Sequence, residues 1–142
     1  MRILGVDFGD RRIGLAVSDQ LQLTAQALGH YTVKNEEEDR QYFTKLVAEY
    51  EIGEIVLGLP LRMDGTSGPR VDKTYAFAKW LEEFLDVPIV YWDERLTTKQ
   101  AMRVLTQQKI KGKAKKQFKD QIAAVFILSS YLESKRERPP CS

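Results

Sequence analysis

The chain begins with two apolar runs separated by a polar turn, RILGVDFGDRRIGLAVS over residues 2–18. The runs at 2–7 and 12–18 are rich in Ile, Leu and Val, and the segment FGDR between them favours a turn. This arrangement predicts a β-hairpin. A third strand is expected at 25–33, although Gly29 lowers the strand propensity there. These residues predict the antiparallel beginning of a sheet.

The following part of the chain alternates between helical and strand patterns. Apolar residues recur at helical spacing over 36–50 and again over 71–85. Each of these stretches precedes a compact apolar run, at 54–58 and at 87–92, as is typical of buried parallel strands. We therefore predict an α/β fold with a mixed five-stranded sheet flanked by helices, in which the first three strands are antiparallel and the last two are parallel.

Towards the C-terminus the pattern becomes less regular. A capping box with Thr97 as N-cap predicts a third helix. The lysine-rich stretch 107–117 has little apolar content and is expected to be a mobile loop. A last helix is expected from near Lys119, so that Asp120 would lie in its first turn. Because the length of 142 residues suits one domain, we expect a single domain over 1–134 and a disordered tail over 135–142.

The composition is that of an ordinary globular protein. Hydrophobic residues make up 43% and charged residues 30% of the chain, and no apolar run approaches the roughly 18 residues that a membrane span requires. The N-terminus lacks the features of a secretory signal, and the single cysteine, Cys141, has no partner for an internal disulfide. We therefore expect a cytoplasmic protein with no membrane segment.

Three carboxylates occupy positions that deserve a chemical explanation. Asp7 ends the first apolar strand, and Glu94 follows the strand at 87–92. A carboxylate at the end of a strand either caps a turn or binds a ligand, and Asp120 by itself fits an acid that stabilises a helix N-terminus. The carboxyl ends of parallel strands open into a common crevice. Three carboxylates gathered there would repel one another unless cations lay between them.

Oxygen ligands of this kind suit Mg²⁺ or Mn²⁺. Two such ions about 4 Å apart activate a water molecule and stabilise the leaving oxygen in phosphodiester cleavage. We therefore predict that Asp7, Glu94 and Asp120 are the metal ligands and catalytic residues of a phosphodiester hydrolase. His30 is the only histidine, and it cannot by itself build a zinc site or a Ser-His-Asp triad.

The charge distribution adds a candidate binding surface. The net charge of +2 is small, but the stretch from Arg95 to Lys119 carries nine basic residues and no acidic one. Because this stretch joins Glu94 to Asp120, we expect it to pass near the metal centre and to contact phosphates without reading sequence. A solvated lysine surface is the alternative. The predicted nucleic-acid contacts are Arg95, Lys109, Lys111, Lys113, Lys115 and Lys116.

Four separated segments resemble the motifs of the YqgF/RuvX family and together cover nearly the whole chain. They are GVDFG at 5–9 with RIGLAVSD at 12–19, GLPL at 58–61 with MDGT at 63–66, DERLTT at 93–98, and Asp120 with AA at 123–124 and IL at 127–128. The fourth motif departs from the family pattern, because Lys119 and Gln121 flank the aspartate where hydrophobic residues are common.

The resemblance implies a ribonuclease H-like fold, a cytoplasmic location and metal-dependent nuclease activity, with Asp7, Glu94 and Asp120 as the carboxylates of the site. It also implies a role in maturing the 5′ end of pre-16S ribosomal RNA, or, through similarity to RuvC, in resolving Holliday junctions. Arg95 and the loop at 63–68 would contact the substrate. Both also have structural explanations: Arg95 would pair with Asp93, and the loop would be a simple turn.

Two hypotheses from other classes remain open. The Asp-Phe-Gly turn resembles a phosphate-binding turn of actin- and Hsp70-type nucleotide-binding proteins, which need two such halves, whereas this chain has room for one. The lysine-rich stretch alone would also suit a non-catalytic nucleic-acid-binding or ribosome-assembly module. The sequence does not decide whether the substrate is RNA or DNA, or whether the protein is a monomer or a homodimer.

Overall fold

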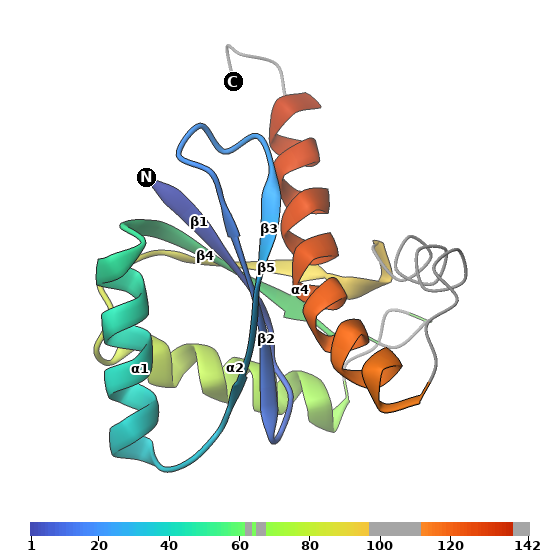
Figure 1. The fold of residues 1–142 in the computed structure, drawn as a ribbon. Helices are drawn as coiled ribbons and strands as arrows, with labels where there is room; N and C mark the ends of the chain where they lie inside the picture. Colours follow the sequence, from blue (N-terminus) through green and yellow to red (C-terminus); the bar gives the residue numbers. More distant parts are fainter. Residues whose placement is uncertain (62–63, 65–67, 97–111, 138–142) are drawn as a thin grey trace.

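The computed structural model describes residues 1–61, 64, 68–96 and 112–137 (Figure 1). The elements follow in the order β1 (Arg2–Asp7), β2 (Arg12–Ser18), β3 (Ala25–Thr32), α1 (Glu36–Glu49), β4 (Ile52–Leu59), α2 (Pro69–Glu82), β5 (Ile89–Asp93), the 3-10 turn η1 (Glu94–Leu96) and α4 (Gly112–Glu137). This order agrees with the predicted one. The helix predicted after Thr97 lies outside the described residues.

The strands form one sheet with the order β3-β2-β1-β4-β5. β1 pairs antiparallel with β2, and β2 pairs antiparallel with β3. β4 lies parallel to β1 on one side and to β5 on the other. The predicted mixed five-stranded sheet is therefore confirmed, and the carboxyl ends of β1, β4 and β5 meet at one edge.

Helices cover both faces of this sheet, with α1 and α2 on one face and α4 on the other (Figure 1). Successive strand residues point to opposite faces, and β1 shows the division clearly. Leu4 and Val6 are fully buried in a cluster with Phe43 of α1, whereas Ile3 is buried in a second cluster with Leu128 of α4. The sheet thus separates two apolar cores.

Helix α4 approaches β1 closely because Gly5 carries no side chain. A Cβ atom at this position would lie 2.8 Å from the Cβ of Leu128 and 3.1 Å from the carbonyl oxygen of Ala124. The first distance is shorter than side chains tolerate, so the helix would have to move away from the strand. Gly5 therefore sets the separation between α4 and the sheet.

The last helix differs from its prediction. It begins at Gly112, so the expected mobile loop at 107–117 is wrong for its described part, and it continues through Glu137 beyond the expected start of the tail. Lysine and glutamine are good helix formers even where apolar residues are scarce, and low apolar content did not reveal this. Asp120 therefore lies in the helix interior and not in its first turn. Although α4 is 26 residues long, neither it nor another described helix is apolar enough to cross a membrane.

We predict that Gly5→Ala lowers the free energy of unfolding by about 1–3 kcal/mol, the usual cost of overpacking a core. Urea-induced unfolding would measure the change. Gly53→Ala is the matched control, because its Cβ would also come as close as 2.9 Å to a side-chain atom, but that atom belongs to Met1, which is 72% exposed and not part of a buried helix contact. Equal losses in both variants would contradict a close contact between α4 and β1.

Candidate metal centre at the carboxyl ends of the parallel strands

The ends of three parallel strands bring the candidate acids to one edge of the sheet. Asp7 is the last residue of β1, and Glu94 follows β5 directly as the first residue of η1. The register pairs Val6 with Leu57, and Leu59 with Asp93. Asp7 and Glu94 are therefore separated laterally by the single intervening strand β4.

Both acids belong to the face of the sheet that α4 covers. Ile3 in β1 and Trp92 in β5 pack in the cluster that contains Leu128 of α4. Asp7 lies four residues after Ile3, so strand alternation assigns it to this face. Glu94 lies against the position of a Gly58 Cβ, which would also meet Ile127 of α4. Their side chains consequently approach each other from either side of β4.

Gly58 in β4 provides the space in which Glu94 is accommodated. A Cβ atom at Gly58 would lie 3.0 Å from Cγ of Glu94 and 3.2 Å from its carboxyl carbon, and it would also collide with Cδ1 of Ile127. Sequence reasoning assigned no role to Gly58. The available signal was a glycine near the end of a buried apolar strand, which often marks close approach of another group.

The structure brings Asp7 and Glu94 into direct interaction. Burial raises the pKa of Glu94, while the hydrogen bond with the Asp7 side chain and the charge of Arg70 oppose that rise, and the charge of Asp93 adds to it. Two carboxylates that share a hydrogen bond must hold a proton or a cation between them. Paired oxygen donors in a partly buried position fit a hard divalent cation such as Mg²⁺ or Mn²⁺.

The third candidate, Asp120, lies in α4 one turn before Ala124, whose carbonyl oxygen faces Gly5. At the other end of the helix, Lys135 donates a hydrogen bond to Gln22, and Gln22 donates one to the carbonyl of Met1. Helix α4 thus runs antiparallel to β1, which carries the backbone of Asp120 towards the edge where Asp7 lies. The side chain of Asp120 lies outside the described part of the structure.

Within the described ranges, no group of three or more acidic, histidine or cysteine side chains is assembled around one point. The pair of Asp7 and Glu94 is therefore the described portion of the candidate centre. The position of Asp120 in the interior of α4 also removes the structural explanation offered by the sequence, because an acid there does not stabilise the helix N-terminus.

Asp93 and Arg95 form a separate interaction beside the centre. The Arg95 guanidinium donates to the Asp93 carboxylate from Nη2 at 2.6 Å and from Nε at 2.9 Å, and its backbone N–H donates at 2.9 Å. These hydrogen bonds lower the pKa of Asp93 and raise that of Arg95. The geometry favours the structural explanation for this pair, in which Arg95 stabilises the turn that carries Glu94.

The predicted lysine contacts are only partly covered. Lys109 and Lys111 lie outside the described residues. Lys113, Lys115 and Lys116 lie at the beginning of α4, with side chains outside the description. In the loop predicted at 63–68, only Asp64 and Gly68 are described. The binding surface proposed from these residues stays a prediction.

Arg70 is a site residue that sequence reasoning missed. It is the second residue of α2, and its positive charge favours the ionised form of Glu94. Lys73, one turn later, forms an ion pair with Asp10 at 3.2 Å. The segment Gly68-Pro69-Arg70 carried a usable signal, since proline is common at the first position of a helix, and a helix beginning there places Arg70 at the edge of the sheet.

The fold resembles that of known nucleases. A T. thermophilus RuvC in complex with Holliday junction substrate superposes with a TM-score of 0.59 at 15% identity, covering 96% of this chain and 97% of that one. The fowlpox virus Holliday junction resolvase superposes with a TM-score of 0.54 at 19% identity, covering 94% and 99%. At these identities the comparison establishes the fold, which is that of the RuvC-like ribonuclease H class.

The sequence comparison identifies the family. The model described as "RuvX: Holliday junction resolvase" matches residues 1–134, and the chain belongs to the RuvX family. A relative from Halothermothrix orenii is 46% identical over 132 residues, which is 93% of this chain and 94% of the relative. A relative from Geobacillus is 45% identical over 140 residues, covering 96% and 100%. Both are named "Putative pre-16S rRNA nuclease".

The raised pKa of Glu94 predicts a pH-dependent loss of stability in metal-free protein. The folded chain retains a proton that the unfolded chain releases at the ordinary glutamate pKa of about 4.3. The free energy of unfolding should therefore include a contribution that is complete below that value and is lost as the pH rises through the raised pKa of Glu94. Glu94→Gln cannot ionise and should lack this contribution.

Urea unfolding in the presence of a chelator, repeated across the acidic and neutral range, would measure the difference between wild type and Glu94→Gln. Glu49→Gln, at the exposed end of α1, is the control and should follow wild type. Saturating Mg²⁺ should restore the lost stability to wild type by binding the ionised pair. Identical pH profiles of stability for wild type and Glu94→Gln would contradict a raised pKa of Glu94 in the folded protein.

Proposed function

We propose that this protein is a nuclease that hydrolyses phosphodiester bonds at a divalent-metal centre formed by Asp7, Glu94 and Asp120. The observation that carries the proposal is the hydrogen-bonded pair of Asp7 and Glu94, which meets in a partly buried position beside Gly58. Such a pair is unfavourable in its doubly ionised form unless a cation lies between the carboxylates. Membership of the RuvX family and the RuvC-like fold support the same activity.

Each described residue has a distinct part in this mechanism. Asp7 is fixed by the ladder of β1, and Glu94 is held by η1 and by the space above Gly58, so the two carboxylates are preorganised to bind one or two Mg²⁺ or Mn²⁺ ions. Bound metal supplies an activated water molecule and neutralises charge on the leaving oxygen. Arg70 adds positive charge at the same edge, where it attracts and orients the substrate phosphate.

The substrate we favour is the precursor of 16S ribosomal RNA, cleaved during maturation of its 5′ end, because the relatives at 45–46% identity bear that name. A cytoplasmic location follows from this substrate. The alternative is a Holliday junction, which the description of the family model favours. A resolvase would require a twofold homodimer to cut two strands symmetrically, whereas an RNA-processing enzyme can act as a monomer.

A paired cleavage assay tests both the activity and the substrate. Precursor RNA spanning the 5′ end of 16S RNA and a four-way DNA junction would each be incubated with the protein and Mg²⁺ or Mn²⁺. We expect the RNA to be cut, and we expect Asp7→Asn and Glu94→Gln to lower the rate by at least about 100-fold, since even outer-sphere changes around a metal cost 10- to 100-fold.

Asp86→Asn is the matched control, because Asp86 is an exposed aspartate in the connection between α2 and β5, and this variant should keep most of the activity. Preferential cutting of the junction would assign the protein to the resolvases. If neither substrate is cut faster by wild type than by Asp7→Asn, the nuclease proposal fails. The non-catalytic module that binds through the lysine-rich stretch would then be the better hypothesis.

Asp120→Asn tests the third ligand separately. The substitution is nearly isosteric, so we expect the fold to persist while cleavage falls to the level of Asp7→Asn and the apparent affinity for Mg²⁺ decreases. Glu133→Gln is the control, because Glu133 is an exposed acid in the same helix. The assay is the metal dependence of the cleavage rate. Equal activity in the two variants would exclude Asp120 from the centre.

A further inference from the structure

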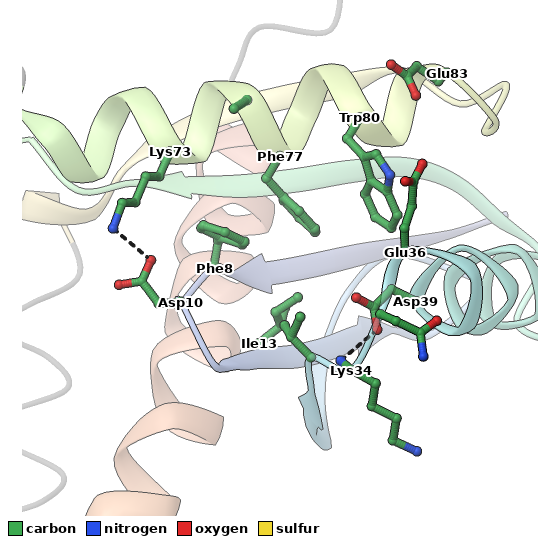
Figure 2. Close-up of a pocket in the computed structure, with 13 residues that line it drawn as sticks. Phe8, Asp10, Ile13, Lys34, Glu36, Asp39, Lys73, Phe77, Trp80 and Glu83 are labelled. Atoms are coloured by element: carbon green, nitrogen blue, oxygen red, sulfur yellow. Dashed lines mark hydrogen bonds and ion pairs between the residues drawn. The ribbon is translucent and has the colours of Figure 1, made fainter.

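A second cavity lies on the other side of the same sheet edge, away from α4. It has a volume of about 620 Å³ and is bordered by α2, the beginning of α1 and the turn between β1 and β2. Figure 2 shows Phe8, Phe77 and Trp80 arranged along this cavity, with Lys73 and Asp10 at one end and Glu36 and Glu83 at the other. A volume of this size suits one small ligand or one nucleotide.

The floor of the cavity is aromatic. The rings of Phe8 and Phe77 stack with centroids 4.5 Å apart, and those of Phe77 and Trp80 lie 5.9 Å apart at an interplanar angle of 28°. Phe77 is buried, whereas Phe8 and Trp80 remain partly exposed to the cavity. Partly exposed aromatic side chains stack with nucleobases in proteins that bind single strands.

The cavity lies beside the sheet edge that carries the candidate metal centre. Phe8 follows Asp7 directly, so the two residues occupy neighbouring positions at the edge of the sheet. A smaller adjoining pocket is bordered by Arg70 and Lys73 together with Phe8. The charge of Arg70 reaches Glu94, so Arg70 and Lys73 form a basic path from the acids to the aromatic floor.

The acidic residues around the cavity are largely engaged with other groups. The Asp39 carboxylate accepts hydrogen bonds from the Tyr31 hydroxyl at 2.6 Å and from the backbone N–H of Lys34 at 3.0 Å. Arg40 forms ion pairs with Glu36 at 2.9 Å and with Glu83 at 3.6 Å.

The ion pair of Lys73 with Asp10 is exposed, with 57% and 69% of the side chains accessible. Exposed ion pairs contribute little to stability, so a phosphate can replace Asp10 as the partner of Lys73 at low cost. The basic end of the cavity therefore remains available for an anionic ligand, and it is the end nearer to the metal centre.

We propose that this cavity binds an unpaired nucleotide of the substrate strand next to the cleavage position. The base stacks on Phe8 and Trp80, and its phosphate lies against Lys73 while Arg70 holds the phosphate nearer the metal centre. The proposal rests on the proposed nuclease function and specifies its substrate class: a strand with at least one unpaired nucleotide beside the scissile bond. A base inside a duplex is already paired and stacked on its neighbours, so only an unpaired nucleotide can turn its base onto the aromatic floor.

Intrinsic fluorescence gives a direct test, since the chain has only two tryptophans. In a Trp92→Phe background, Trp80 is the sole reporter. The protein would be titrated, in the presence of a chelator to prevent cleavage, with a short single-stranded oligonucleotide and with a blunt duplex of the same sequence. Anisotropy of labelled nucleic acid would report total binding. We expect the single strand, and not the duplex, to quench Trp80.

Two variants extend the test to affinity. Trp80→Leu removes a stacking surface, and Lys73→Gln removes an exposed cation without disturbing the core. Each should weaken binding of the single strand by about 5- to 100-fold, the effect expected for one stacked base or its phosphate contact. In cleavage assays they should raise KM and leave kcat nearly unchanged. Tyr75→Leu and Lys79→Gln, exposed on the same helix, are the matched controls.

The outcomes separate this inference from the nuclease proposal. The single strand could bind and be cut while Trp80 fluorescence stays unchanged and Lys73→Gln binds as tightly as wild type. The cavity would then not hold the nucleotide, and only the proposed nucleotide site would fail. Equal quenching by duplex would overturn the requirement for an unpaired nucleotide. Quenching by a free nucleoside monophosphate but not by the oligonucleotide would assign the cavity to a metabolite. If the wild-type protein neither binds nor cuts either nucleic acid, the proposed nuclease function itself fails.

Discussion

The contact of α4 with two glycine positions in the sheet determines the geometry of the candidate centre. At Gly5 the helix lies so close to β1 that a Cβ would meet Leu128 at 2.8 Å, and at Gly58 a Cβ would meet both Ile127 and Glu94. The same missing side chain that lets the helix approach β4 also provides the volume that Glu94 occupies. The packing of the core and the position of the proposed metal ligand Glu94 are therefore not independent, and a side chain at Gly58 would disturb both.

The pairing of Asp7 with Glu94 is unfavourable for folding when both carboxylates are ionised and no cation lies between them. Burial and the neighbouring Asp93 both favour the protonated form of Glu94 and so raise its pKa. The two apolar clusters on opposite faces of the sheet offset this cost, because they bury residues from β1 to β4 and from α1, α2 and α4. Binding sites often retain such locally unfavourable arrangements, since the ligand relieves them. Here the relief would come from the metal that the proposed mechanism requires.

Most of the fold could be predicted because each strand and the first two helices have a recognisable pattern in their own consecutive residues. The alternation in β1 and β2, the helical spacing in α1 and α2, and the apolar runs of β4 and β5 are properties of consecutive residues. The beginning of α4 was missed because its first turns lack an apolar face, although their lysines favour helix. The error moved Asp120 from the interior of the helix to its first turn and supplied a structural explanation that the fold does not support.

The candidate site was only partly predictable for a different reason. Asp7 and Glu94 could be found because strand ends at one edge of a parallel sheet must converge. Gly58 and Arg70 could not, because their roles depend on distances between elements far apart in the chain. The pairing of Asp93 with Arg95 likewise distinguishes two neighbouring acids that look equivalent in sequence, and it leaves Glu94 as the one directed to Asp7.

Asp7 and Phe8, which end β1 and begin the turn, contribute to different features on the two faces of the sheet. Asp7 contributes to the carboxylate pair on the face of α4, and Phe8 contributes to the aromatic cavity beside α2. A metal held by these carboxylates would act on any phosphodiester, because phosphate contacts carry no information about base or strand. Selection among nucleic acids must therefore come from groups outside the metal centre. The α2 face supplies such groups within one residue of the centre, which makes it the part of this fold where a preference for unpaired over fully paired substrate would arise.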